Sequence, residues 1–265
     1  MGELLSATIL GLVQGITEFL PISSTGHLII ARELLGLQVE YGLAFDAFLH
    51  LATALAVLIY FWKDWRRLFF SALSYVQGKG IETKEKVLIL ALIAGTIPAA
   101  VIGFFSESRI EEYFRNVEFV AYALIAGSVL FLIAEWVGKQ NEGLSIKKGW
   151  WIGFFQALAL IPGMSRAGST IAGGLLFGLS REEAARFAFL LSMPIILGVG
   201  GIKGFELFGG GAFSHSLFPI LVSAVSAFVA GILSIHFLLK YLRTHTLGIF
   251  IVYRVALAIA IFIFI

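Results

Sequence analysis

Six long apolar stretches dominate this chain. They cover residues 43–62, 87–105, 117–137, 184–203, 217–239 and 247–265. A helix needs about 20 mostly apolar residues to cross the hydrocarbon core of a bilayer, and each stretch is close to that length. The pattern predicts an all-α polytopic membrane protein with six full transmembrane spans.

Two shorter apolar stretches are each interrupted by a proline. A turn rich in Ser and Gly follows the proline, and a second short apolar piece follows the turn. The first set is 4–20, Pro21 and 28–37, and the second set is 150–161, Pro162 and 171–179. Irregular backbone at membrane depth is tolerated only where protein buries it or where it lines a wet cavity. We therefore expect two re-entrant helical hairpins that enter the bilayer and turn back.

The two hairpins open halves of the chain that resemble each other. Allowing single-residue gaps, the alignment matches Gly11-x-x-Gln14 and Pro21-x-x-Ser24-x-Gly26 with Gly153-x-x-Gln156 and Pro162-x-x-Ser165-x-x-Gly168. Three spans follow each hairpin, and three spans change sides of the membrane whereas a re-entrant hairpin does not. We therefore expect a single membrane domain, 1–265, in which repeat one (1–137) and repeat two (138–265) form an inverted-topology repeat with the site near the midplane.

The basic residues indicate the orientation in the membrane. Loop 63–86 carries six of them, and loops 138–149 and 240–246 add more on the same side of this arrangement. Because cytoplasmic loops are enriched in Lys and Arg, we expect this side to be cytoplasmic and both termini to lie outside. Residues 1–20 lack the basic segment of a secretory signal peptide and are not expected to be cleaved.

The composition agrees with a membrane protein and excludes some other classes. Of the 265 residues, 59% are hydrophobic and 14% are charged, and the net charge is +2. The chain has no cysteine, which excludes a disulfide framework and thiolate metal ligands. It has no basic run interleaved with aromatic residues, so we expect no nucleic-acid partner.

Hairpin one places polar side chains in apolar surroundings. The set consists of Gln14, Glu18, Ser23, Ser24, Thr25 and His27. Gln14 and Glu18 are four residues apart and share a helix face, and His27 can carry a proton near neutral pH. Ionisable groups at membrane depth are costly, so their presence is a functional-site hypothesis by default.

Hairpin two adds further hydroxyls and a guanidinium. The set consists of Ser165, Arg166, Ser169 and Thr170, with glycines at 163 and 168. Arg presents a planar fork that suits phosphate oxygens, and hydroxyls with backbone amides at a helical turn complete an anion site. We expect that anion to be phosphate. Small residues also serve helix packing alone, and a structural Glu18–Arg166 ion pair is compatible with either reading.

Three other polar residues have open roles. Asp46 and His50 are spaced i,i+4 at the start of a span, where they either form a local pair or line the site. Arg254 lies in the middle of a span, so it must face protein or water. There it is either structural or a contact for a phosphate or lipid headgroup.

The two motifs together resemble the family of undecaprenyl-diphosphate phosphatases, also called bacitracin-resistance proteins. The resemblance rests on Gln14-Gly-Ile-Thr-Glu18-Phe-Leu-Pro-Ile-Ser-Ser24-Thr-Gly-His27 and on Pro162-Gly-Met-Ser165-Arg166-Ala-Gly-Ser-Thr170, and the span pattern agrees over the whole chain. It implies a multi-pass enzyme of the bacterial plasma membrane. That enzyme hydrolyses undecaprenyl diphosphate to undecaprenyl phosphate and inorganic phosphate, which recycles the lipid carrier of peptidoglycan synthesis.

The resemblance also implies roles for individual residues. Glu18, His27 and Arg166 would be functional, with Ser24 suggested as the nucleophile; we expect His27 to be its base and leave the reverse assignment open. Phosphate-binding residues would be Gln14, Ser23, Thr25, Ser165, Ser169 and Thr170. A divalent cation, Mg²⁺ or Ca²⁺, could bridge Glu18 to the diphosphate, because hard cations favour carboxylate and phosphate oxygens. The family has Glu or Gln at the place of Gln14, so an obligatory carboxylate pair is in question.

A transporter or flippase of a polyprenyl phosphate lipid is the alternative function. Inverted repeats with broken helices that meet at the midplane also build transporters. A binding site for transport needs Arg and amides, but it does not need hydroxyl, imidazole and carboxylate groups capable of attack and proton transfer. The expected partners are a polyprenyl diphosphate lipid and the bilayer, with a homodimer left open.

Overall fold

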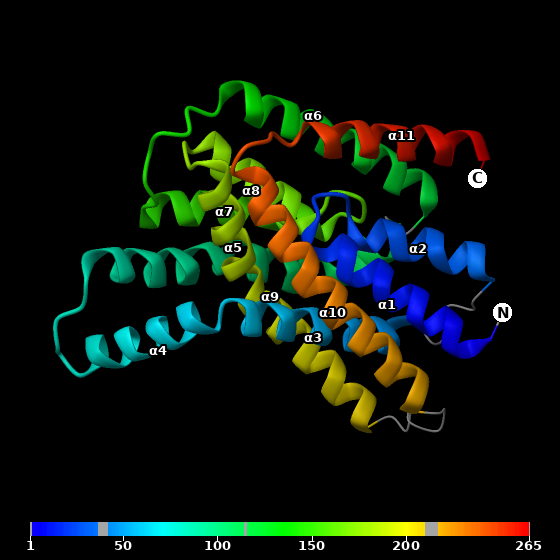
Figure 1. Ribbon diagram of the computed structural model, residues 1–265, viewed down its shortest axis with the longest axis horizontal. Coiled ribbons are helices and arrows are strands. Elements are labelled where there is room, and N and C mark those ends of the chain that lie inside the picture. Colours follow the sequence, from blue (N-terminus) through cyan, green and yellow to red (C-terminus); the bar gives the residue numbers. More distant parts are fainter. Residues whose placement is uncertain (1, 37–41, 114–115, 210–216, 265) are drawn as a thin grey trace.

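The computed structural model describes residues 2–36, 42–113, 116–209 and 217–264, and over these ranges it contains helices and no strand. Figure 1 shows the arrangement of α1 (Glu3–Phe19), α2 (Ser24–Leu35), α3 (Gly42–Tyr60), α4 (Trp62–Val76), α5 (Thr83–Tyr113), α6 (Val117–Val137), α7 (Ile146–Ala157), the 3₁₀ helix η2 (Leu158–Leu160), α8 (Arg166–Leu176), α9 (Arg181–Gly209), α10 (Leu217–Leu242) and α11 (Gly248–Phe264). The prediction of an all-helical membrane protein is confirmed at this level.

Each of the six expected spans corresponds to a helix. Stretch 117–137 coincides with α6, and the others correspond to α3, α5, α9, α10 and α11. Within the described residues, three segments are both long and apolar enough to cross a membrane, namely Thr83–Ser106, Val117–Val137 and Phe218–Leu242. The apolar segments Phe48–Tyr60 and Gly248–Phe264 are shorter, and α9 opens with three charged residues. The number six therefore remains a prediction.

Part of the expected loop 63–86 is helix α4. Its Leu68 is buried, while Phe69, Phe70 and Val76 are exposed. An apolar search misses this helix because three of its first six residues are basic. Such a helix, with cations beside exposed aromatic side chains, is typical of one that lies at a membrane surface.

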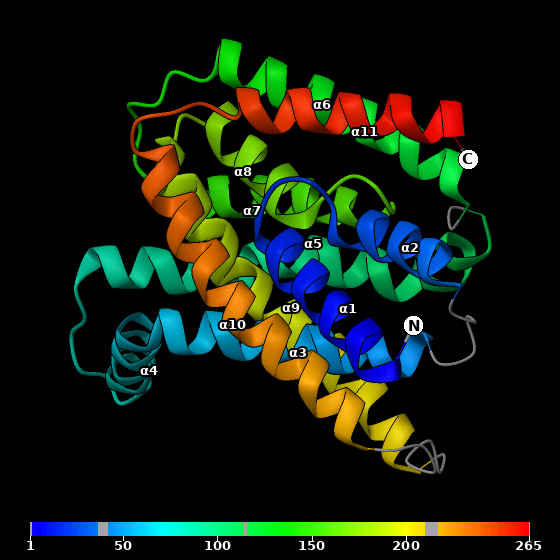
Figure 2. The same ribbon diagram turned by 45° about the vertical axis from the view of Figure 1, so that its right-hand side comes forward.

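The two halves pack in the same way. In the first half α1 pairs with α2 and lies along α10, and in the second half α7 pairs with α8 and lies along α5. The helices α3 and α9 contact each other, as do α6 and α11, which run side by side in Figure 2. The contact of α1 with α10 thus has its counterpart in the contact of α7 with α5, and α3·α9 and α6·α11 each join corresponding elements of the two halves.

Glycines permit the closest of these contacts. A Cβ atom on Gly11 or Gly15 of α1 would lie 2.3 Å from a backbone carbonyl oxygen of α10, and one on Gly153 of α7 would lie 2.2 Å from the carbonyl oxygen of Gly95 in α5. Small residues are what allow helices in membranes to approach at this distance. Glycines therefore allow α1 to pack closely on α10 and α7 to pack closely on α5.

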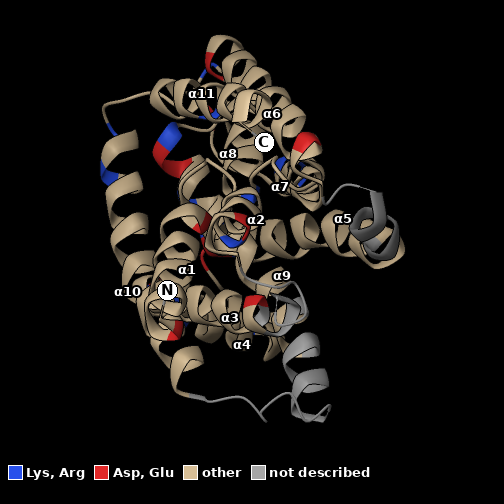
Figure 3. Cartoon of the chain, turned by 90° about the vertical axis from the view of Figure 1, so that its right-hand side faces the viewer, with Lys and Arg blue, Asp and Glu red and all other residues tan. Residues whose placement is uncertain are grey.

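Many of the helix ends lie at two opposite ends of the bundle, whereas the α1–α2 and α7–α8 turns lie between them (Figure 1). Helix α1 begins and α11 ends at one end, whereas the α4–α5, α6–α7, α8–α9 and α10–α11 connections lie at the other (Figure 1). Viewed towards the end with the termini, the ribbon is mostly tan, with few charged segments (Figure 3). The loops rich in Lys and Arg all belong to the opposite end.

Candidate active site

Both hairpins turn through a serine with left-handed backbone geometry. Ser23 has φ 77° and precedes α2, and Ser165 has φ 71° and precedes α8. Each serine Oγ accepts a hydrogen bond from a glycine N–H three residues later, at 3.3 Å from Gly26 and 3.2 Å from Gly168. A positive φ is uncommon for residues other than Gly and clusters at functional sites.

These serines correct the sequence alignment by one residue. The equal spacing from Pro21 and Pro162 matched Ser24 with Ser165, but the structure makes Ser23 the counterpart of Ser165. The turn of hairpin two is one residue longer, so the proline spacing misplaced the gap. Ser24 and Arg166 therefore hold equivalent positions, as the first residues of α2 and α8.

Glu18 joins the two hairpins. Its Oε2 accepts a hydrogen bond from Ser24 Oγ at 2.7 Å, and its Oε1 accepts one from Arg166 Nη1 at 3.3 Å. Glu18 is 7% exposed, and a buried carboxylate is tolerated only when it is paired and hydrogen-bonded. Arg166 follows Glu18 by 148 residues, so one carboxylate connects two distant parts of the chain, α1–α2 and α8.

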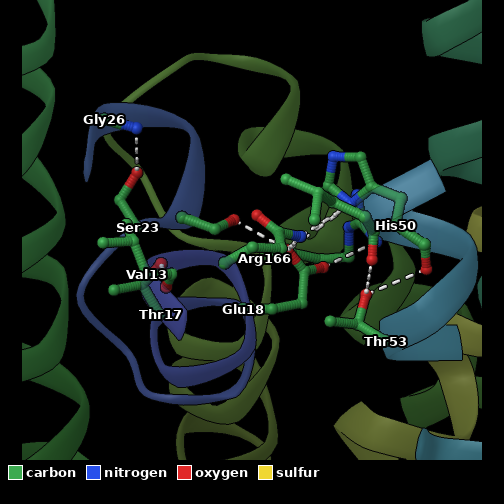
Figure 4. Close-up of polar contacts among 11 residues, drawn as sticks. Val13, Thr17, Glu18, Ser23, Gly26, His50, Thr53 and Arg166 are labelled. Carbon is green, nitrogen blue, oxygen red and sulfur yellow. Dashed lines mark hydrogen bonds and ion pairs between the residues drawn. The ribbon is translucent and has the colours of Figure 1, made fainter. Parts of the chain in front are cut away.

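Gln14 and His50 complete the surroundings of this carboxylate. Gln14 Nε2 lies 3.0 Å from Glu18 Oε2 and 3.1 Å from Nδ1 of His50. His50 Nδ1 is 3.6 Å from Glu18 Oε2, and Figure 4 shows Glu18, Arg166 and His50 converging. The i,i+4 partner of His50 points elsewhere, because Asp46 pairs with Arg32.

His27 faces away from this group. Its Nδ1 lies 2.7 Å from the carbonyl oxygen of Ser23, its Nε2 lies 2.7 Å from the hydroxyl of Tyr253, and the two rings stack with centroids 5.6 Å apart. Since a carbonyl only accepts, the hydrogen-bond network assigns the proton to Nδ1. Within the described chain, no hydrogen bond joins His27 to Ser24 or Glu18, so the expected Ser24–His27 contact is not made.

The remaining predicted phosphate ligands lie around the turns. Thr25 is exposed beside Ser24, whereas Ser23 and Ser165 use their hydroxyls as helix caps. Ser169 is buried and donates to the carbonyl oxygen of Met164 at 3.4 Å. Thr170 is buried, and its hydroxyl has no hydrogen-bond partner among the described residues. The structure thus gathers Gln14, Glu18, Ser24 and Arg166 into one network and leaves the others at its edge.

The Arg254 side chain donates hydrogen bonds to the turns of both hairpins. This side chain of α11 is 0% exposed, and its guanidinium lies 4.8 Å from the ring centroid of Phe131. It donates to the carbonyl oxygens of Pro21, Gly163, Met164, Ala123 and Leu124 at 3.1–3.4 Å. Of the two roles left open for Arg254, these contacts favour the structural one.

Sequence reasoning gave two of these residues too little weight. His50 had a signal in its position at the start of a span, but the carboxylate it contacts belongs to another helix. Tyr253 had no signal, because a tyrosine in an apolar helix is ordinary. The packing of α3 on α1 brings His50 to Gln14, and the packing of α11 beside α2 brings Tyr253 to His27.

The chain was also compared with known proteins. Residues 7–260 match the family model described as bacitracin resistance protein BacA. Relatives named undecaprenyl-diphosphatase include those of Rubrobacter xylanophilus, 41% identical with 97% of each chain covered, and Thermodesulfovibrio yellowstonii, 41% identical with 99% of this chain and 97% of the relative covered. That of Elusimicrobium minutum is 42% identical over 97% of this chain and 96% of its own. On this evidence the protein belongs to the bacitracin resistance protein BacA family.

Proposed function

We propose that this protein is an integral membrane phosphatase that hydrolyses undecaprenyl diphosphate to undecaprenyl phosphate and inorganic phosphate. The name undecaprenyl-diphosphatase, carried by relatives aligned over nearly the whole chain, supports this substrate. The observation that carries the chemistry is the Glu18 carboxylate, which bonds a hydroxyl from one hairpin and a guanidinium from the other. The product is the lipid carrier of cell-wall synthesis, ready for reuse.

In the proposed mechanism, Arg166 binds the terminal phosphate. Its planar fork suits phosphate oxygens, and the N-terminal amides of α2 and α8 beside it favour an anion. Ser24 Oγ attacks the terminal phosphorus, a bond forms between them, and the bond from that phosphorus to the bridging oxygen breaks. Arg166 stabilises the charge that develops on the transferring group.

Glu18 is the proposed base of the first step. Its Oε2 already accepts a hydrogen bond from Ser24 Oγ at 2.7 Å, within the reach required of a general base. Undecaprenyl phosphate leaves. Water then forms a bond to the phosphorus of the phosphoserine, the bond from phosphorus to Ser24 Oγ breaks, Glu18 returns its proton to Oγ, and inorganic phosphate is released with the protons of the water. Both ring nitrogens of His27 are bonded elsewhere, so we assign His27 to holding the Ser23 turn.

A divalent cation, Mg²⁺ or Ca²⁺, is proposed to bind between Glu18 and the diphosphate. The described residues contain no group of three or more His, Cys, Asp or Glu side chains that could hold a metal alone. They do offer the Glu18 carboxylate and Gln14 Oε1, a buried oxygen without a hydrogen-bond partner. One or two protein oxygens with substrate phosphates form a common Mg²⁺ site, so the residues fit. The cation would neutralise charge on the diphosphate.

The proposed architecture has six transmembrane spans and two re-entrant hairpins in the bacterial plasma membrane. Helices α3, α9 and α11 would complete the six, and residues 1–137 and 138–265 would form the inverted repeat. The matched pairing of α1 with α10 and of α7 with α5 supports this repeat. The positive-inside rule orients the basic end towards the cytoplasm.

Paired cysteine variants test the orientation. Gly80→Cys, at the basic end, should be protected from an impermeant thiol reagent in intact cells, and Gly2→Cys should label. A Cβ atom at either position meets nothing within 4 Å, and the chain has no native cysteine. Labelling is read on a gel after purification, with permeabilised cells as the control in which both label. Labelling of Gly80→Cys alone in intact cells would reverse the orientation.

Arg166 tests the function. Arg166→Ala should lower phosphate release from a long-chain prenyl diphosphate by roughly 100- to 1,000-fold, because it removes a donor that stabilises charge in the transition state. Arg166→Lys should restore little, since the charge returns without the bidentate fork. The measurement is inorganic phosphate released by purified protein in detergent.

Arg243→Ala is the matched control for Arg166. Its pair with Glu182 is exposed at the basic end, so release should stay near native. Native-like release by Arg166→Ala at equal expression would remove Arg166 from the site. Absence of release from the native protein, with transport of the lipid between leaflets instead, would favour the flippase alternative.

A further inference from the structure

His50 takes no part in the proposed mechanism, although it lies beside Gln14 and Glu18. His50 belongs to α3, and its Nδ1 lies 3.1 Å from Gln14 Nε2 and 3.6 Å from Glu18 Oε2. Its backbone is held in place, because Thr53 Oγ1 donates to the His50 carbonyl oxygen at 2.9 Å. The neighbouring Leu49 is fully buried. The backbone of His50 is therefore fixed, and its ring is held beside Gln14.

The contacts of Gln14 determine which way its amide points. The amide nitrogen has two hydrogens and lies between two acceptors, Oε2 of Glu18 at 3.0 Å and Nδ1 of His50 at 3.1 Å. The reversed amide would put Oε1 against the carboxylate oxygen, where two acceptors repel. Nδ1 of His50 must then be unprotonated, and the ring hydrogen sits on Nε2.

Because the Gln14 amide is buried, a change in its orientation would have a large energetic cost. Gln14 is 0% exposed, so water does not replace a lost partner, and an unsatisfied buried group is costly. Without His50, one amide hydrogen would lose its acceptor, and the contact with Glu18 alone would hold the amide. A shift of the amide would weaken the Gln14 hydrogen bond to Glu18 Oε2, the oxygen that also accepts from Ser24.

We propose that His50 is a positioning residue: its Nδ1 holds the Gln14 amide against Glu18, which keeps Oε2 aligned with Ser24 Oγ. The inference rests on the proposed function only for the step that Ser24 and Glu18 perform. With Nε2 placed in this way, Gln14 Oε1, which has no hydrogen-bond partner among the described residues, would stay available as an oxygen ligand for the proposed cation.

Two substitutions of His50 distinguish the effect of its hydrogen-bond acceptor from the effect of its side-chain volume. Asn carries Oδ1 at the same number of bonds from Cβ as Nδ1 and can only accept there, whereas Leu keeps volume without an acceptor. We expect His50→Leu to lower kcat for phosphate release by about tenfold, with KM changed less than about twofold, as for a coupled contact next to the reacting groups. His50→Asn should recover to within about threefold of native.

The Gln14→Leu background shows whether His50 acts through Gln14. There His50→Leu should add little to the loss, since the amide that it holds is gone. The midpoint of thermal unfolding can be measured for the native protein, the two single Leu variants and the double variant. This measurement does not depend on catalytic activity, and the two substitutions should again be non-additive. If the native protein releases no phosphate, the proposed function fails, and the unfolding cycle still tests the His50–Gln14 contact.

His236 is the matched control. It is an exposed histidine of α10 whose Nδ1 also has one hydrogen-bond partner, Tyr60, at 3.2 Å, and its Leu and Asn variants should release phosphate like the native protein. Native-like kcat in His50→Leu would overturn the proposal. So would an Asn variant as slow as Leu, or full additivity with Gln14→Leu in both rate and unfolding.

Discussion

The Glu18→Gln variant is expected to release phosphate at least about 100-fold more slowly than the native protein. The amide has the shape of the carboxylate, but it has no negative charge to accept the Ser24 proton or to pair with Arg166. The same variant should lose Mn²⁺ binding in the presence of a prenyl diphosphate, measured by electron paramagnetic resonance. Phosphate release should be followed across pH 5 to 9 to separate lost chemistry from a shifted optimum.

Glu33→Gln is the matched control for Glu18→Gln. Glu33 lies on α2 of the same hairpin, and its side chain is exposed, so its neutralisation should leave release unchanged. Equal expression and an unfolding midpoint close to native are needed to attribute the loss to the site. A Glu18→Gln protein as active as the native one at every pH would refute the base and cation roles together.

The Arg254→Leu variant is expected to show the largest loss of stability. The substitution leaves the turn carbonyls of Pro21, Gly163 and Met164 without this donor, and each unsatisfied buried group costs about 1–3 kcal/mol. A loss of about 3 kcal/mol would lower the unfolding midpoint of a chain of this size by about 10 °C. Phosphate release should fall as well, because the same turns carry Ser24 and Arg166.

Arg254→Lys and Arg243→Leu are the comparison variants for Arg254→Leu. Lysine keeps the charge and some donors, so it should recover part of the midpoint but not all the carbonyl contacts. Arg243 forms an exposed pair with Glu182, and exposed pairs contribute little to stability. An Arg254→Leu protein that unfolds at the native temperature would show that the turns hold their shape without the guanidinium.

The sequence indicates the helical membrane class and the place of the hairpins because both depend on local patterns. Apolar stretches of sufficient length correspond to helices, and Pro21 and Pro162 stand where α1 and α7 have ended. The rule that buried charges need partners made a Glu18–Arg166 pair foreseeable, and the structure contains that pair at 3.3 Å. These inferences needed no knowledge of side-chain direction.

Side-chain direction is where sequence reasoning fails. Spacing in the chain put His27 near Ser24, yet its ring turns towards Tyr253, which is 226 residues away. The role of His50 depends on how α3 packs on α1, and no local pattern encodes that. Helix α4 escaped detection because a hydropathy search weighs its three basic residues and ignores the apolar face beside them.

The equivalence of Ser24 and Arg166 bears on how such a protein can have arisen. If two identical subunits inserted in opposite orientations, as in a dual-topology dimer, their contact would offer either two hydroxyls or two guanidiniums at these positions. It could not offer one of each to a single carboxylate. Joining the copies in one gene removes that restriction, because each copy can then mutate alone.

If the two halves arose in this way, the first residues of α2 and α8 are a place where they have diverged. One copy keeps a side chain able to form a bond to phosphorus, and the other has one able only to attract the phosphate oxygens. Two turns whose serines share the same backbone geometry thus supply different chemistry to one carboxylate.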